Sequence, residues 1–140
     1  MVYLKKKDLS KLVDIVEKNN LWIISDEVYE ELIFSEDFIS PLEIESLAKR
    51  TVVVSSISKS HAAPGFRSGW VFAQADVINK MLPLAETMLF GNQPFIADMT
   101  AYAISNKSKT AIKMKTDYER RAKLICKKLA KTKNIRPIMP

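Results

Sequence analysis

Two short apolar runs, each preceded by a segment with helical character, restrict the possible folds more than any other feature of the sequence. Residues 21–25 and 51–55 have the length and the β-branched content of buried strands. The first follows an amphipathic segment that Asp8 can cap. The second follows Ser-Pro-Leu-Glu at residues 40–43, a helix start with a capping serine, which leads into a short helix to about Arg50. Two consecutive helix-then-strand units predict a parallel α/β sheet.

Residues 55–70 form a loop rich in polar groups that follows the second of these strands. A proline–glycine pair forces a turn inside the loop, its serines favour local hydrogen bonds, and apolar character resumes at residues 69–73 as a third strand. The same turn holds Lys59 and Arg67, and Asp26 ends the first strand. Because function in such sheets gathers at the carboxyl ends of the strands, this pattern predicts a cofactor site there.

The second half of the chain is predicted to be mainly helical. Helical stripes run over residues 77–88, from Pro94 onward, and from Ser108 to about Lys131, and residues 135–140 could begin a further strand. A sheet of only three strands would leave both of its edges unpaired. The chain is therefore predicted to be part of a larger sheet.

Composition limits the classes of protein that fit. With 140 residues, of which 47% are apolar and 27% charged, the chain is long enough for one domain with a real core. Its net charge of +6 comes mainly from lysines at residues 5–7 and after residue 107, and a solvated face is favoured over a surface for nucleic acid or an anionic membrane. Cys126, which has apolar neighbours, predicts a core thiol in a reducing compartment. No apolar run is long enough to cross a membrane, and a cytoplasmic protein is expected by default.

The residue types in the loop indicate a particular chemistry. A lysine partly shielded from water, as expected of Lys59, loses its proton more readily and becomes an amine that forms a Schiff base with an aldehyde. Arg67 offers a fork for a phosphate, and Ser56 or Ser58 can add hydroxyl donors. Pyridoxal 5′-phosphate carries both an aldehyde and a phosphate.

Asp26 and Tyr29 could supply the remaining contacts that this ligand needs. Asp26 can keep a pyridine nitrogen protonated, which makes the cofactor an electron sink, and Tyr29 can donate to the phenolic oxygen. Taken singly, each residue has an ordinary explanation: a solvated lysine, a surface ion pair, a strand-end cap or a packing tyrosine. The combination of Asp-x-x-Tyr after one strand with Ser-x-x-Lys and then Arg after the next is rare, and it favours the cofactor site. No metal site is predicted.

Three segments carry a resemblance to a known family: Ile-Ser-Asp-Glu-Val-Tyr at residues 24–29, Ser-Ile-Ser-Lys at 56–59, and Pro-Gly-Phe-Arg-Ser-Gly-Trp at 64–70. They closely resemble the class I/II, fold-type I, pyridoxal-phosphate-dependent aminotransferases, and the resemblance runs through most of the chain. It implies part of the fold-type I large domain, an α/β architecture with a mostly parallel sheet, one antiparallel strand near residues 70–73 and flanking helices. It also implies a homodimer that transfers amino groups between amino acids and 2-oxo acids.

The resemblance further implies a role for each matched residue. Lys59 is the Schiff-base lysine and then the base that moves a proton between the α-carbon of the amino acid and C4′ of the cofactor. Asp26 pairs with the pyridine nitrogen, and Tyr29 pairs with the phenolic oxygen. Ser56 and Arg67 bind the phosphate.

The chain departs from the family in its extent. Family members are more than twice as long. The chain lacks the asparagine of the Asn-Pro-x-Gly segment, the loop that completes the phosphate cup, the aromatic residue that stacks on the pyridine ring, and the C-terminal arginine that grips the substrate carboxylate. Residues 1–131 are accordingly expected to be a partial cofactor-binding large domain, and residues 132–140 the start of a truncated small domain. His61 has no role in the family pattern, and a loop-packing or solvated histidine is expected.

Three functional interpretations stay open from the sequence. The first is an aminotransferase whose remaining parts lie outside this chain, with an aspartate-type or broad-specificity substrate range favoured. The second is a cofactor-domain fragment that catalyses nothing by itself. The third is a basic helical module that binds an anionic partner through the lysines after residue 107, and an affinity that falls steeply with salt at unchanged cofactor content would favour it.

Overall fold

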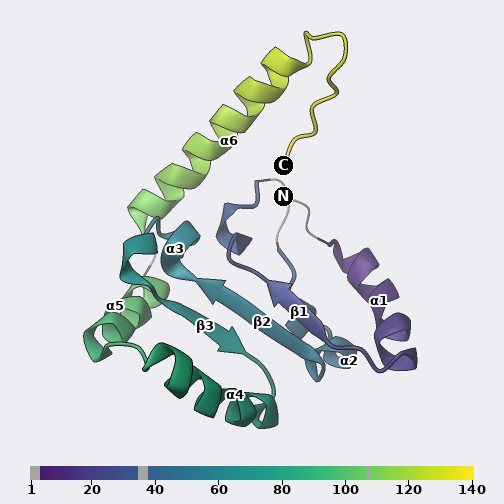
Figure 1. Ribbon diagram of the computed structural model, residues 1–140. Coiled ribbons are helices and arrows are strands. Elements are labelled where there is room, and N and C mark those ends of the chain that lie inside the picture. Colours follow the sequence, from purple (N-terminus) through teal and green to yellow (C-terminus); the bar gives the residue numbers. More distant parts are fainter. Residues whose placement is uncertain (1–3, 35–37, 107) are drawn as a thin grey trace.

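The computed structural model describes residues 4–34, 38–106 and 108–140, so residue 107, where the lysine-rich region was expected to begin, lies outside the described residues. The strands within these ranges are β1 (Ile23–Asp26), β2 (Thr51–Ser56) and β3 (Gly69–Phe72). The α-helices there are α1 (Lys6–Lys18), α2 (Glu45–Ala48), α3 (Ile57–Ser60), α4 (Ala75–Leu89), α5 (Pro94–Ser105) and α6 (Lys109–Leu129). The 3-10 helices there are η1 (Glu30–Leu32), η2 (Pro41–Glu43) and η3 (Pro64–Phe66). The predicted α/β class is confirmed (Figure 1).

The strands of the described residues form one mixed sheet in the order β1-β2-β3 (Figure 1). β1 and β2 are parallel, with Asp26 opposite Val54. β3 is antiparallel to β2, with Gly69 opposite Ser56. The predicted strands are found with their ends shifted by one or two residues, and the antiparallel third strand is confirmed. Since β1 has no neighbour on its outer side among the described residues, it is an edge strand there.

β1 is less buried than the sequence predicts. A continuous apolar run predicts a strand that is covered on both faces, but side chains of β1 alternate between half-buried and exposed. Ile23 packs against a buried cluster, whereas Ile24 is 77% exposed. The expectation of a fully buried strand is therefore wrong, because the described residues cover only the face that carries Ile23.

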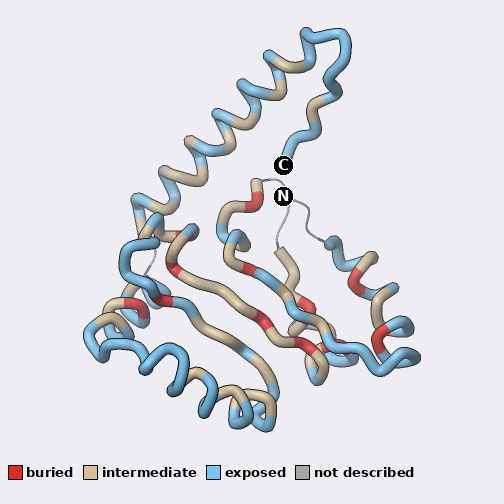
Figure 2. Tube along the Cα trace, viewed as in Figure 1, coloured by how far each residue is buried: buried red, intermediate tan, exposed pale blue. Residues whose placement is uncertain are grey.

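The main apolar core joins α1 and α2 to this covered face of the sheet. Leu9 and Val16 of α1 and Leu47 of α2 are each at most 3% exposed, and Ile23 and Ile44 pack against them. Figure 2 shows buried positions in α1, in β2 and in α3, while α4 and α6 carry exposed and half-buried positions. The helical stripe predicted for the first segment thus faces the core, as its spacing requires.

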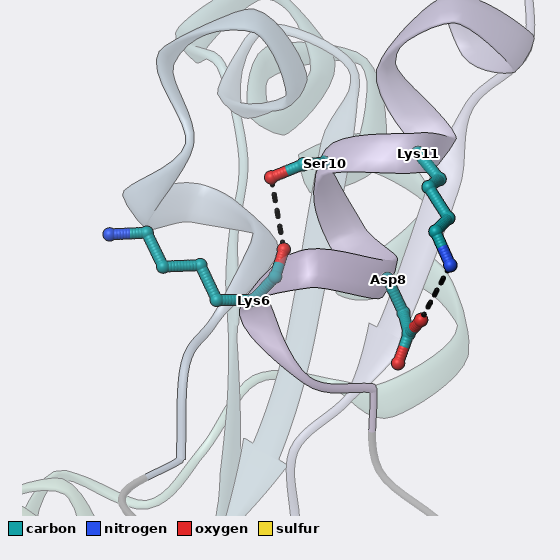
Figure 3. A network of polar contacts seen from close by, with 4 residues as sticks. All are labelled: Lys6, Asp8, Ser10 and Lys11. Carbon is teal, nitrogen blue, oxygen red and sulfur yellow. Dashed lines mark hydrogen bonds and ion pairs between the residues drawn. The ribbon is translucent and has the colours of Figure 1, made fainter.

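α1 begins earlier than the sequence predicts, and Asp8 does not cap it. Lys5 holds the N-cap position, and Asp8 lies in the first turn of the helix. Its carboxylate Oδ1 lies 3.3 Å from Nζ of Lys11, and Ser10 Oγ donates to the carbonyl oxygen of Lys6 at 3.0 Å (Figure 3). The expected cap is wrong, but the carboxylate still favours the helix, since a negative charge in the first turn complements the helix dipole.

The helix start predicted at Ser40 is confirmed, but the helix is shorter than expected. Ser40 and Glu43 form a reciprocal capping box, in which Ser40 N donates to Glu43 Oε1 at 2.9 Å. The turn that follows is a 3-10 helix, and Ile44 then adopts an extended conformation with φ −103° and ψ 107°. A separate helix begins at Glu45. The single helix expected to reach about Arg50 is therefore two short pieces.

Helices α4, α5 and α6 occupy the second half of the chain, as predicted. Pro94 is the first residue of α5, and Ser108 caps α6 by accepting a hydrogen bond from Ala111 N at 3.2 Å. α6 extends away from the sheet (Figure 1), and neither α4 nor α6 has a buried residue among those described. Their apolar stripes are real, but the described residues do not cover them.

Two expectations for the end of the chain are wrong. Cys126 is half-buried instead of a core thiol, its Sγ lies 3.8 Å from the carbonyl oxygen of Ile138, and the neighbouring Leu124 is 47% exposed. Residues 135–140 contain no strand. The domain boundary at residue 132 stays a prediction. None of the helices in the described ranges is both long enough and apolar enough to cross a membrane.

Candidate active site

The ends of β1 and β2 bring together the residues singled out from the sequence. β1 ends at Asp26 and β2 ends at Ser56, and the two strands are parallel neighbours. Tyr29 directly precedes η1 after the first strand, and Lys59 lies in α3 directly after the second. Because parallel neighbours run in one direction, both connections leave the same edge of the sheet.

Ser56 forms the junction between β2 and α3. Its Oγ accepts a hydrogen bond from Ser58 N at 3.3 Å, which caps α3 and places Lys59 on its single turn. Accepting this bond uses a lone pair of the oxygen, so the hydroxyl hydrogen can still be donated to a ligand.

Lys59 and Tyr29 line one cavity of about 600 Å³. The Nζ atom of Lys59 lies 6.0 Å from the centroid of the Tyr29 ring. The other residues that line the cavity are Leu32, Ile33, Phe34, Ser58, Ala62, Pro64, Tyr118 and Pro140. A mainly apolar hollow with a few polar groups is typical of a small-molecule site.

Lys59 is more exposed than the sequence predicts. It belongs to the exposed residues of the described chain, although its side chain contributes to the cavity wall. α3 is a single turn at the edge of the sheet, and the described residues surround it incompletely. The expectation of a lysine shielded from water is therefore wrong for these residues.

Asp26 lies beside the cavity and does not line it. It is exposed, and its Oδ1 accepts a hydrogen bond from Val28 N at 3.2 Å. Asp26 instead lines a neighbouring hollow of about 240 Å³, and Tyr29 lines both hollows. Ile33 also lines both hollows, so the hollow of Asp26 adjoins the cavity of Lys59 at Tyr29 and Ile33.

Arg67 also lies outside the lining of the large cavity. It is exposed, its φ of 53° is left-handed, and its Nη1 donates to the carbonyl oxygen of Pro64 at 2.9 Å. The structure therefore brings Lys59, Tyr29 and Ser58 together at one cavity and turns the guanidinium of Arg67 toward its own loop.

Glu27 is a buried residue of this region that the sequence reasoning missed. It is only 5% exposed, its Oε1 accepts a hydrogen bond from Ser40 Oγ at 2.7 Å, and its backbone N donates to Val54 O at 2.9 Å. These bonds anchor the segment between Asp26 and Tyr29. Nothing in the local sequence distinguishes Glu27 from a solvated glutamate, because its side-chain partner is 13 residues away.

His61 is confirmed as a loop-packing histidine. Its Nδ1 lies 2.9 Å from Ser60 Oγ, and its Nε2 lies 3.0 Å from the carbonyl oxygen of Ala103 in α5. Ser68 and Thr100, which the sequence reasoning did not single out, make a second contact between the same loop and α5, with 2.7 Å between their hydroxyl oxygens. Their separation along the chain hides both contacts from any local pattern.

Glu30 gives a prediction for the dependence of stability on pH. Burial, followed by the nearby charges of Glu27 and Glu31, raises the pKa of Glu30 above 4.5. A raised pKa means that ionised Glu30 destabilises the folded state, and that this cost disappears as pH falls below the unfolded pKa. Glu30→Gln is therefore expected to increase the free energy of unfolding slightly at pH 7, and the gain should vanish toward pH 4.

Urea unfolding of the wild type and Glu30→Gln between pH 4 and 7 measures this difference. Glu86→Gln, at an exposed position of α4, serves as the control. A gain that stays constant over this pH range would contradict the assignment of the effect to the Glu30 carboxylate.

Comparison with known proteins agrees with this arrangement of motifs and fold. The family model for aminotransferase class I and II matches residues 2–140. An arginine–pyruvate transaminase of Pseudomonas aeruginosa is 37% identical over 129 residues, which are 92% of this chain and 33% of that protein. An aspartate aminotransferase of Pyrococcus abyssi is 34% identical over 129 residues, with 90% of this chain and 33% of that protein covered.

Solved aminotransferase structures are likewise similar to most of this chain. The crystal structure of an aromatic aminotransferase from Pyrococcus horikoshii superposes with a TM-score of 0.89 at 31% identity, over 97% of this chain and 38% of that chain. The present chain thus spans about a third of the length of the curated relatives it matches. Since the family model covers nearly every residue, the chain belongs to the class I and II aminotransferases.

Proposed function

We propose that this chain binds pyridoxal 5′-phosphate covalently through Lys59 and forms the cofactor-binding part of an aminotransferase. One observation carries the proposal: Lys59 Nζ and the Tyr29 ring line the same cavity at the carboxyl ends of two parallel strands, in a member of the aminotransferase family. A volume of about 600 Å³ lies within the range of small-ligand sites and accommodates a substituted pyridine ring.

Lys59 performs the covalent step in this proposal. Its unprotonated Nζ is the amine that would condense with the aldehyde carbon of the cofactor, with loss of one water molecule. Once an amino acid had displaced it, the free Nζ would be the base that takes the proton from the substrate α-carbon and the acid that returns it at C4′ of the cofactor. When bound, the pyridine ring supplies an electron sink for the pair left on the α-carbon.

Tyr29 and Asp26 orient the ring. The hydroxyl of Tyr29 donates a hydrogen bond to the phenolic oxygen of the cofactor. The carboxylate of Asp26 would hold a proton on the pyridine nitrogen, because a nearby negative charge favours the protonated form. The position of Asp26 in the adjoining hollow, which shares Tyr29 and Ile33 with the cavity of Lys59, supports this division of roles.

The phosphate end is assigned to Ser56, Ser58 and Arg67. Ser56 Oγ and Ser58 belong to the start of α3, immediately before Lys59, where their hydroxyls can donate to phosphate oxygens. Arg67 would exchange its hydrogen bond with the carbonyl oxygen of Pro64 for bonds to the phosphate. An arginine–phosphate pair joins two opposite charges and is frequently bidentate, whereas the carbonyl oxygen of Pro64 is neutral, and this difference favours the phosphate.

The reaction partners are an amino acid and a 2-oxo acid, and the active assembly is proposed to be a homodimer. An aspartate-type or broad range of substrates is proposed, in keeping with relatives whose names specify aspartate and arginine–pyruvate transamination. The exposure of Lys59 and the orientation of Arg67 favour one alternative, in which this chain binds little cofactor and has no activity by itself.

Reductive trapping of the cofactor distinguishes a chain that binds pyridoxal 5′-phosphate at Lys59 from one that binds little cofactor. The purified chain is incubated with pyridoxal 5′-phosphate and reduced with borohydride, which converts the carbon–nitrogen double bond to a stable secondary amine, and labelled peptides are identified by mass spectrometry. A single label on Lys59 that inorganic phosphate suppresses is the expected result. Labels scattered over many lysines, or no label, would reject the proposal in favour of the alternative.

Arg67→Ala tests the phosphate assignment in the same experiment. Loss of the charged partner should raise the cofactor concentration for half-maximal labelling of Lys59 by about 10- to 100-fold, while saturating cofactor still labels Lys59. Labelling with pyridoxal, which lacks the phosphate, should be unchanged by Arg67→Ala. An equal loss with pyridoxal and with pyridoxal 5′-phosphate would show that Arg67 acts on the loop and does not bind the phosphate.

A further inference from the structure

The loop between β2 and β3 is attached to α5 at two points. At the first, His61 Nε2 lies 3.0 Å from the carbonyl oxygen of Ala103. At the second, the hydroxyls of Ser68 and Thr100 share a hydrogen bond of 2.7 Å, and these residues are only 5% and 8% exposed. Thr100 and Ala103 are three positions apart and so lie on the same face of α5. We call these two contacts, His61 with Ala103 and Ser68 with Thr100, the α5 pins.

The hydrogen-bond donors around His61 can be assigned from the chemistry of its partners. A carbonyl oxygen can only accept, so Nε2 of His61 carries the hydrogen that it donates to Ala103. In the neutral ring Nδ1 then accepts, and Ser60 Oγ, at 2.9 Å, is its donor. Ser60 directly follows Lys59 and is the last residue of α3. Its hydroxyl has one hydrogen, which this arrangement directs to His61, so the bonds of His61 join the C-terminal end of α3 to α5.

The backbone next to each pin is strained. Ala62, which follows His61, has a φ of 50°, and Arg67, which precedes Ser68, has a φ of 53°. These values lie in the left-handed region, which is unfavourable for residues with a Cβ atom. Such conformations persist where the surrounding structure holds them. The α5 pins fix His61 and Ser68, which are the neighbours of these two strained residues.

We propose that His61 is a positioning residue for Lys59, and that the α5 pins hold the loop in the conformation that places Lys59 at the cavity. A loop that is already held in its binding conformation loses little conformational entropy when the cofactor binds. Its affinity for the cofactor is therefore higher than that of a mobile loop. This inference rests on the proposed function for the role of Lys59, whereas the attachment of α3 to α5 is independent of it.

Three variants separate the two hydrogen bonds of His61. His61→Phe keeps a ring of similar size and removes both bonds. His61→Gln places an amide nitrogen near the position of Nε2, and so retains a donor for Ala103. His61→Asn places its amide near the position of Nδ1 and retains only a partner for Ser60. A ring that served only to fill space would be replaced best by phenylalanine.

Two measurements are made on each variant of the full chain. Amide hydrogen exchange of residues 57–63, without cofactor, reports how firmly α3 is held. The pyridoxal 5′-phosphate concentration for half-maximal borohydride labelling of Lys59 measures how well the Lys59 site binds the cofactor. His61→Phe and His61→Asn are expected to speed exchange and to raise the half-labelling concentration by about tenfold each, and His61→Gln by less than about threefold.

The second pin has a matched control in α4. Thr100 Oγ1 donates to the carbonyl oxygen of Ile96 at 2.7 Å, and Thr87 Oγ1 makes the same bond to Pro83 at 2.8 Å, but Thr100 also contacts Ser68. Thr100→Val and Thr87→Val therefore both lose a bond within their helix. We expect only Thr100→Val to raise the half-labelling concentration, by about three- to tenfold.

Equal exchange and equal labelling in wild type and His61→Phe would overturn the proposal, and so would a rescue by asparagine as complete as that by glutamine. An absence of Lys59 labelling in the wild type would reject the proposed function and, with it, the presentation of Lys59 to this cofactor. In that case the exchange rates of the His61 variants would still decide whether His61 attaches α3 to α5.

Discussion

Lys59→Ala is expected to abolish borohydride-stable attachment of pyridoxal 5′-phosphate at the cavity. Among the described residues, Lys59 is the lysine that lines this cavity, and alanine leaves no amine there to condense with the aldehyde. Because the covalent bond requires that amine, the effect is a complete loss of the specific label and not a graded weakening. Peptide mass spectrometry after reduction measures the label, and circular dichroism verifies that the variant is folded.

Two further variants make this result specific. Lys59→Arg keeps a positive charge but provides no amine of suitable basicity, so it should lose the label as completely as alanine does. Lys49→Ala removes an exposed lysine at the C-cap of α2 and should leave the label on Lys59 intact. A label of undiminished intensity that moves to another lysine in Lys59→Ala would contradict the assignment.

Gly69→Ala is expected to destabilise the fold by about 2–3 kcal/mol. A Cβ atom at this position would lie 2.8 Å from the carbonyl oxygen of Ser55 and 3.3 Å from Cβ of Ser56. The nearest atom is backbone in the paired strand, so β2 and β3 must move apart to relieve the contact. The displaced segment carries Ser56 and leads into α3, and the variant should therefore also weaken labelling of Lys59.

Gly65→Ala is the matched control for this prediction. A Cβ atom at Gly65 would meet nothing within 4 Å, and its φ is not in the left-handed region. Its effect should stay below about 1 kcal/mol, with a stabilising contribution from the reduced freedom of the unfolded chain. Urea unfolding of both variants provides the free energies. Equal losses at the two glycines would show that the close approach at Gly69 is not what sets the cost.

The sequence alone predicted the elements whose signals are local. Ser40 with Glu43, Pro94 and Ser108 each mark a helix start, and the structure confirms all three because a cap acts within one turn of the backbone. β-branched runs likewise located the strands, and the helix-then-strand order indicated that β1 and β2 are parallel. Resemblance of the motifs to the aminotransferases, confirmed by the family model, supplied the antiparallel direction of β3.

Burial was predicted less well, because periodicity identifies an apolar face and not what covers it. The stripe of α1 packs into the core, whereas α4 and α6 have similar stripes and no buried residue in the described chain. The same reason explains the errors at Ile24 and Cys126. Whether an apolar residue is buried depends on segments that are distant in sequence, and no local pattern contains them.

At the site, the sequence by itself determined which residues lie at the ends of the two parallel strands and just after them: Asp26 and Tyr29 for one, Ser56 and Lys59 for the other. Only the tertiary structure decided that Lys59 and Tyr29 share a cavity and that Arg67 turns to its own loop. It alone revealed the contact of His61 with Ala103, which joins residues 42 positions apart. The physical reason is that hydrogen bonds and cavities depend on distance in space, and chain order specifies that distance only within a few residues.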